Sequence, residues 1–84
     1  MNEIVARALV DLVASIELTS DDELDPDLAA AWLDDVAAAL EGLSDPDRHD
    51  LVRLISEMAR ATRDENRRDA LVDLPDDLGL IEEG

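Results

Sequence analysis

The residues of this chain that could take part in chemistry are carboxylates and a single histidine. The sequence contains 23 Asp and Glu residues, one histidine, His49, and no cysteine. Enzymatic catalysis needs a group that titrates near neutral pH, or a nucleophile beside its activating base. The sequence has no HExxH motif and no glycine-flanked serine, and its three glycines are too scattered to form a phosphate-binding loop. We therefore predict a protein that is not an enzyme and that uses no cofactor.

The densest run of carboxylates consists of Asp21, Asp22, Glu23, Asp25 and Asp27. Clustered carboxylate oxygens suit Ca²⁺, but the EF-hand pattern does not fit this run. Counted from Asp21, Pro26 takes the place of the turn glycine and Trp32 that of the bidentate glutamate. His49 has no second histidine or cysteine to complete a site. We predict no dedicated metal site and an exposed His49.

Size and acidity resemble those of an acyl carrier protein, which presents a modified serine at the start of a helix. The Asp-Ser-Leu signature of that family is absent, because Ser44 lies in Leu-Ser-Asp-Pro and Ser20 in Thr-Ser-Asp. The resemblance is therefore limited to size and charge.

The charge is strongly negative and unevenly distributed. The net charge is −16, thirteen carboxylates fall within the first 47 positions against Arg7 alone, and six of the seven arginines lie between residues 48 and 69. Nucleic acid and anionic membranes would be repelled, so a basic protein is the natural partner. Codon bias of a high-GC genome, or adaptation to salt, would also explain a lysine-free acidic chain.

The spacing of apolar residues predicts one all-α domain over residues 1–84, a small antiparallel bundle of three main helices, a short fourth helix and a C-terminal tail. We place the helices at residues 3–18, 26–41, 45–62 and 65–74, and the tail at residues 75–84. The buried stripe of the first helix is expected at Ile4, Val5, Ala8, Leu9, Leu12, Val13 and Ile16. That of the second is expected at Leu28, Ala29, Trp32, Leu33, Val36, Ala37 and Leu40.

Local signals mark the ends of these helices. Asp25-Pro26 and Ser44-Asp45-Pro46 are typical N-terminal caps, and Gly42 suits a left-handed C-terminal cap. The third helix is expected to bury Leu51, Val52, Leu54, Ile55, Met58 and Ala59.

The polar stretch 60–69 fits two structures. Either the chain turns near residues 62–66, with Thr62 and Glu65 as a capping box, or one long helix projects a charged segment into solvent. Pro75 is expected to close the last helix, and Leu78, Leu80 and Ile81 to fold back over the bundle.

Two sets of charged residues recur every seven positions and are candidate partner-binding residues. Asp27, Asp34 and Glu41 form an acidic row, and Arg53, Arg60 and Arg67 form a basic row on one helical face. The arginines either pair locally with neighbouring carboxylates or dock on the acidic first half, within the chain or across a dimer.

We therefore expect a small acidic, non-catalytic interaction module that binds and regulates or neutralises a basic protein in the cytoplasm. The alternative is a self-associating structural bundle, such as a homodimer, whose acidity is background. Small aliphatic cores favour self-association. Trp32, the only aromatic residue, is either core or an interface anchor. No stretch is apolar enough to span a membrane, and the N-terminus lacks the basic start of a signal peptide.

Overall fold

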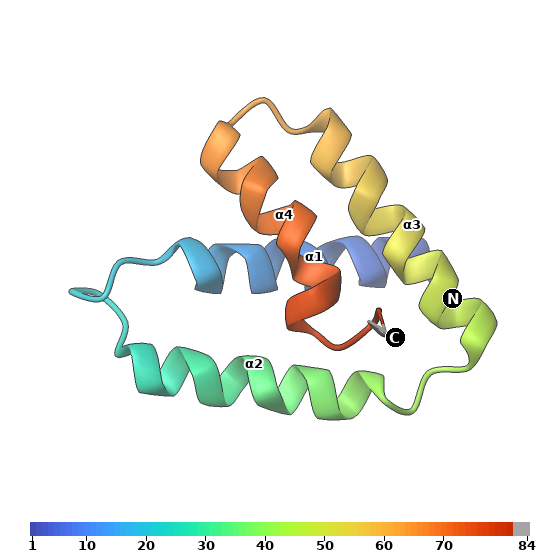
Figure 1. Cartoon of the computed structure of the whole chain (residues 1–84), viewed down its shortest axis with the longest axis horizontal. Coiled ribbons are helices and arrows are strands. Elements are labelled where there is room, and N and C mark those ends of the chain that lie inside the picture. Colours follow the sequence, from blue (N-terminus) through green and yellow to red (C-terminus); the bar gives the residue numbers. More distant parts are fainter. Residues whose placement is uncertain (82–84) are drawn as a thin grey trace.

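The computed structural model describes residues 1–81, and helices are the only regular secondary structure over that range (Figure 1). Its four helices are α1 (Glu3–Leu18), α2 (Pro26–Leu40), α3 (Asp45–Ala61) and α4 (Glu65–Asp77). The predicted all-α bundle with a shorter fourth helix is confirmed. The last three residues of the predicted tail, 82–84, lie outside the described residues.

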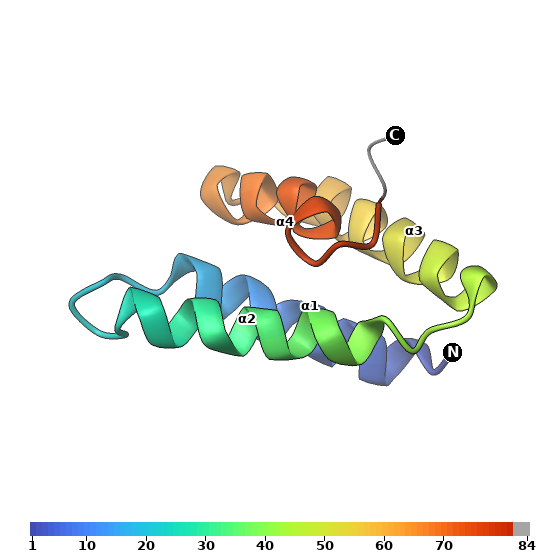
Figure 2. The ribbon, with the colours of Figure 1, turned by 60° about the horizontal axis from the view of Figure 1, so that its bottom comes forward.

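The helices form two antiparallel pairs that lie in two layers (Figures 1 and 2). The pair α1–α2 forms one layer, and the pair α3–α4 crosses α1 to form the other. The helix α1 approaches both α3 and α4. Among the described residues, no Cα atom of α2 lies within 8 Å of α3 or α4, so the backbone of α2 is close to α1 alone.

Each helix starts at a side chain that accepts hydrogen bonds from the free amides of the first turn. The Asp25 carboxylate accepts from Asp27 N at 2.9 Å, and the Ser44 hydroxyl accepts from Asp47 N at 3.3 Å. Both caps were predicted from the sequence. The turn between α3 and α4 is also present, but its cap is Asp64, which accepts from Arg67 N at 3.0 Å.

The predicted capping box of Thr62 and Glu65 is therefore wrong. The Thr62 hydroxyl donates back to Met58 O at 2.6 Å, so it closes α3 and is not available to start α4.

The predicted left-handed cap at Gly42 is also wrong. Within residues 1–81 only Gly79 has a positive φ, of 68°. The last turn of α2 instead tightens, since Gly42 N bonds Ala39 O at 3.3 Å and Leu43 N bonds Leu40 O at 3.1 Å. These i to i−3 bonds satisfy carbonyls at the helix end without a left-handed residue.

Pro75 does not close α4, contrary to the sequence prediction, because the helix continues through it to Asp77. Gly79 lies two residues beyond the helix end, where Leu80 N bonds Pro75 O at 2.8 Å and Gly79 N bonds Asp76 O at 3.0 Å. This bond pair is the Schellman motif, which requires the left-handed conformation that glycine adopts readily. The motif turns Leu78 and Leu80 into the core, while Ile81 stays exposed.

The core is aliphatic and comes from three helices and the residues that follow α4. The most deeply buried large side chains are those of Val10, Val13, Leu51, Ile55, Leu71 and Leu74. The inner face expected for α3 is correct, with Leu51, Leu54, Ile55 and Ala59 buried and Val52 and Met58 partly buried against them.

The stripe expected for α1 is largely wrong. The helix buries Ala6, Val10, Val13 and Ala14, whereas Ile4, Val5, Ala8 and Leu12 are exposed. The reason is that α1 carries apolar residues on most of its circumference, so its periodicity fits more than one face. The face that contains Ala6 and Ala14 is the one used, since small side chains there let α3 and α4 approach closely.

In α2, which lies wholly within the described residues, no residue is fully buried. Leu33, Val36, Ala37 and Leu40 pack partly against the core, while Leu28 is 44% and Trp32 43% exposed. The interpretation of Trp32 as the core's largest side chain is therefore wrong.

These positions predict different costs for two leucine truncations. Leu54 is 6% and Leu12 60% exposed, so Leu54→Ala should lower the free energy of unfolding by about 2–5 kcal/mol and Leu12→Ala by less than about 0.5 kcal/mol. Urea unfolding followed by circular dichroism measures both. Equal losses for the two variants would contradict the assigned face of α1.

Candidate functional site

The acidic row of the sequence prediction lies along one side of α2. Asp27, Asp34 and Glu41 are all exposed, and a spacing of seven residues is about two helical turns, which aligns them. Glu41 lines a depression with Leu78, Gly79 and Leu80. Glu41, directly after α2, is therefore the member of the acidic row that is turned toward the end of α4.

Trp32 lies on the other flank of α2. It precedes Glu41 by nine residues, or about two and a half turns, and Leu28 shares its side because it lies one turn earlier. On α1, Val5 and Leu12 are 63% and 60% exposed. Each directly precedes a buried residue, so each points about 100° away from the core-facing side. We call Val5, Leu12, Leu28 and Trp32 the apolar flank.

A groove lies between the start of α1 and the end of α2, and Val5 of the apolar flank lines it. Val5 and Leu9 of α1 face Leu40 and Leu43, Leu51 of α3 also lines the groove, and its volume is about 240 Å³. The two helices run antiparallel (Figures 1 and 2), and Val5 of α1 lies near Leu40 of α2. Seven residues after Val5 is Leu12, and seven residues before Leu40 is Leu33, which directly follows Trp32. Leu12 therefore lies at the level of Leu33. The apolar flank therefore continues from the groove along the α1–α2 layer.

The charge of this layer is almost entirely negative. Residues 1–43 contain one arginine, Arg7, and the carboxylates Glu3, Asp11, Glu17, Asp21, Asp22, Glu23, Asp25, Asp27, Asp34, Asp35 and Glu41. Arg7 is itself paired, with its Nη2 3.1 Å from Glu3 Oε1. Asp35 follows Trp32 by three residues and so borders the apolar flank, and the acidic run 21–25 lies at its end.

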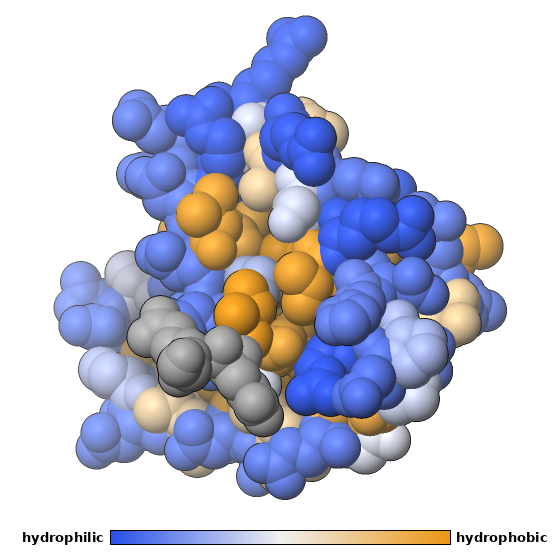
Figure 3. Space-filling view, turned by 45° about the vertical axis from the view of Figure 1, so that its right-hand side comes forward, coloured by the Kyte–Doolittle hydropathy of each residue, from blue (hydrophilic) through white to orange (hydrophobic). Residues whose placement is uncertain are grey.

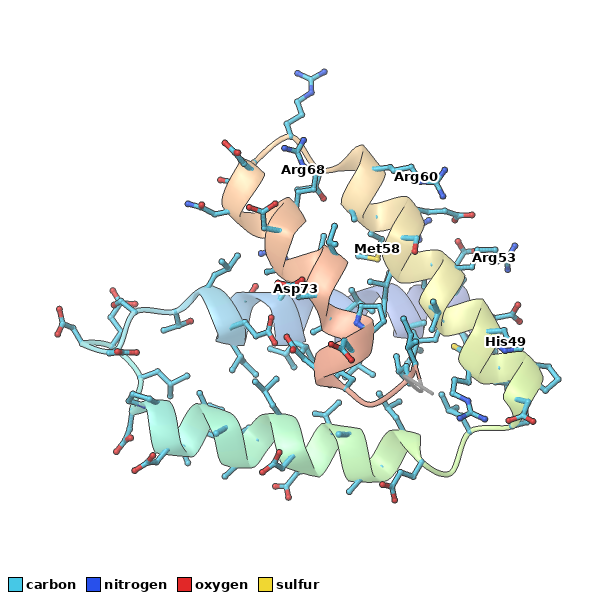
Figure 4. All side chains as sticks on the ribbon, viewed as in Figure 1. His49, Arg53, Met58, Arg60, Arg68 and Asp73 are labelled. Carbon is cyan, nitrogen blue, oxygen red and sulfur yellow. The ribbon has the colours of Figure 1, made fainter. Side chains whose placement is uncertain are left out.

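The predicted basic row is not a single helical face. Arg53 and Arg60 lie on α3, whereas Arg67 lies beyond the turn, in the first turns of α4. Arg53 pairs locally, with Nη2 3.3 Å from Asp50 Oδ1. Figure 4 shows Arg53 and Arg60 projecting from α3 on the side away from α4. The turn at residues 62–64 therefore separates the three arginines that the sevenfold spacing had grouped.

Arg67 docks on the acidic first half within the chain, one of the two alternatives left open by the sequence. Its Nη2 donates to Asp11 O at 3.1 Å and lies 3.3 Å from Asp11 Oδ1, and its Nη1 donates to Ser15 Oγ at 3.4 Å. These bonds connect the start of α4 to the middle of α1. The role of Arg67 that the structure describes is thus to fasten the two layers together.

A second apolar hollow lies between α3 and α4. Figure 3 shows apolar surface gathered in a recess bordered by hydrophilic residues. The residues that line a depression of about 370 Å³ there are Ser56, Ala59, Arg60, Arg68, Leu71, Val72 and Pro75. In Figure 4, Arg60 and Arg68 project from different helices and do not converge on one point.

His49 is exposed on α3, as expected, and lines a wide open depression of about 710 Å³ with Asp45, Arg48, Val52, Arg53, Leu80 and Ile81. Within residues 1–81, no group of three or more His, Cys, Asp or Glu side chains is arranged to hold a metal ion. That the protein is no enzyme remains a prediction.

Three carboxylates meet where α4 crosses α1. Burial, a hydrogen bond with Asp77 and the negative charges of Asp77 and Asp73 on α4 together raise the pKa of Glu17 on α1 to about 7, and burial is the largest of these causes (Figure 4 labels Asp73). This cluster was missed in the sequence, because the three residues are brought together by the crossing of two distant helices. The apolar flank was missed for a different reason, since its residues were assigned to the core.

Comparison with protein-family models, with curated protein sequences and with solved structures gives no match to this chain. None of the helices in the described part of the chain combines the length and apolar character needed to cross a bilayer.

The carboxylate cluster predicts a pH dependence of stability. With an ordinary pKa of 4.5 in the unfolded chain and about 7 in the folded protein, Glu17 holds a proton in the folded state that the unfolded state releases. The free energy of unfolding should therefore fall as pH rises from 4.5 through 7. Glu17→Gln should remove this component, and should stabilise the protein at pH 8 by about 1 kcal/mol, since Glu17 is only half-buried and partly screened.

Urea unfolding at pH 5, 6, 7 and 8 tests this expectation, with Glu57→Gln on the exposed side of α3 as the control. Identical pH profiles for the wild type and Glu17→Gln would contradict the assigned cluster.

Proposed function

We propose that this protein is a small acidic interaction module that binds a basic protein through its α1–α2 layer and thereby regulates or neutralises it. The observation that carries the proposal is the combination, on one layer, of eleven carboxylates against one paired arginine with exposed Leu12, Leu28 and Trp32. Acidity alone has a background explanation in codon usage or salt adaptation. Exposed large apolar side chains on the same layer do not follow from either.

The two features would act at different stages of binding. The negative field of the layer attracts a basic partner over a distance set by the Debye length, about 8 Å at physiological salt, and so raises the association rate. Apolar side chains act only on contact, where burial of their surface lowers the dissociation rate. The acidic row on one flank of α2 and the apolar flank on the other separate these contributions in space. The cytoplasmic location remains part of this proposal.

A structural role through self-association is the second candidate, and the absence of any fully buried residue in α2 favours it. A small domain that leaves one helix half outside its core gains burial by pairing with a copy. If this candidate holds, sedimentation velocity should show a dimer at micromolar concentration that persists or strengthens as salt is raised. A monomer at all salt concentrations would remove it.

Charge reversal of the acidic row tests the first candidate. The triple variant Asp27→Lys, Asp34→Lys, Glu41→Lys should keep its helical content, because all three side chains are exposed, while capture of a basic partner from a lysate of the source organism should fall at least tenfold at low salt. Capture by the wild type should also weaken as salt rises.

The matched control reverses Glu57, Asp69 and Asp76, three exposed carboxylates of the α3–α4 layer, and so changes the net charge equally. Equal loss in the two triple variants would mean that net charge, and not the α1–α2 layer, governs capture. Full capture by the first variant would reject the acidic row as the binding surface.

A further inference from the structure

We infer that the apolar flank is a docking site for an amphipathic helix of the partner, one that carries apolar residues on one side and Arg or Lys beside them. This inference rests on the proposed function and specifies the partner's chemistry. Its starting point is that Val5, Leu12, Leu28 and Trp32 are between 43% and 63% exposed on one layer. The apolar side of α3, in contrast, is buried or partly buried in the core.

The shape of the surface suits a helix. Two antiparallel helices present a seam between their side-chain ridges, and a third helix packs by placing its own ridge in that seam. The groove formed by Val5, Leu9, Leu40 and Leu43 provides a recess of about 240 Å³ at one end, wide enough for one or two aliphatic side chains. The helix α1 has 16 residues, so a partner helix of similar length, about 24 Å, would cover the whole flank.

The charge around the flank selects the partner. Asp35 borders Trp32, and Asp21, Asp22 and Glu23 lie at the end of the layer where α1 passes into α2, whereas Arg7 is occupied by Glu3. A partner helix with arginines or lysines beside its apolar side would pair with these carboxylates. A symmetric second copy would bring this acidic layer against the same acidic layer of its partner, and an anionic membrane would add further negative charge.

Trp32 makes the inference directly measurable, because it is the only aromatic residue and lies on the flank itself. The probe is a synthetic 18-residue helical peptide without aromatic residues, with leucines at positions i, i+4, i+7 and i+11 and with lysines and arginines beside them. Binding should shift the Trp32 emission to shorter wavelength as water leaves the indole. A peptide of identical composition, reordered so that the leucines lie all around the helix, should bind at least tenfold more weakly.

Two single variants of the full chain locate the site. Leu12→Ser on the flank should weaken peptide binding about tenfold, whereas Val72→Ser, which alters an equally exposed apolar residue beside the α3–α4 hollow, should change it less than twofold. Both residues are exposed, and circular dichroism verifies that both variants fold.

Several outcomes would overturn the inference. Equal binding of the two peptides would show that charge alone acts, and a larger effect of Val72→Ser would place the site on α3–α4. A blue shift of Trp32 on concentrating the protein without peptide would show that a second copy covers the flank. If neither peptide shifts Trp32 but reversal of the acidic row still abolishes capture of the partner, the helix-docking inference fails and the proposed function stands. If both measurements are negative, both fail.

Discussion

The limited capacity of a small core is the constraint on which this structure depends. The deepest core positions are Val10 and Val13 from α1, Leu51 and Ile55 from α3, and Leu71 and Leu74 from α4. None comes from α2, whose backbone approaches α1 alone. A chain of 84 residues with one aromatic residue buries three helices against one another and leaves the fourth at the edge. The exposure of Leu28 and Trp32 follows from that limited capacity.

The charged residues reinforce the same division. Six of seven arginines lie on α3, α4 and the turn between them, where they offset part of the acidic charge, while the α1–α2 layer has almost no compensation. The crossing of α1 and α4 shows both signs of interaction. Arg67 attracts Asp11 at one end of the crossing, and at the other end the negative charges of Asp73 and Asp77 repel that of Glu17. The second contact is favourable only while a proton is shared among the carboxylates, so acidity also limits the stability of the fold.

Features that are set by neighbouring residues could be predicted from the sequence. Asp25 and Ser44 cap helices because the side chain and the amides it serves lie within three residues of each other. Features for which several local structures compete could not be predicted from the sequence. Gly42 could adopt a left-handed conformation, but the i to i−3 hydrogen bonds in the last turn of α2 make that conformation unnecessary. The helix α4 continues past Pro75 because the Schellman motif at Gly79 caps it further along the chain. The buried face of α1 was the least predictable feature, because α1 carries apolar residues on most of its circumference. Only the approach of α3 and α4 selects the face that contains Ala6 and Ala14.

The misassigned faces and the candidate site have one cause. A prediction from periodicity takes the apolar residues of a helix to be buried in the core. This assumption fails for Leu12 and Trp32, which lie on helices with more apolar surface than the core can accept. In the proposed function this excess is what a partner covers. Because α2 has a single helical neighbour, a helix bound along the apolar flank would give it a second one, so that binding would also stabilise the fold. In this proposal acidity attracts basic proteins in general, whereas the position of α2 would determine which of them can be held.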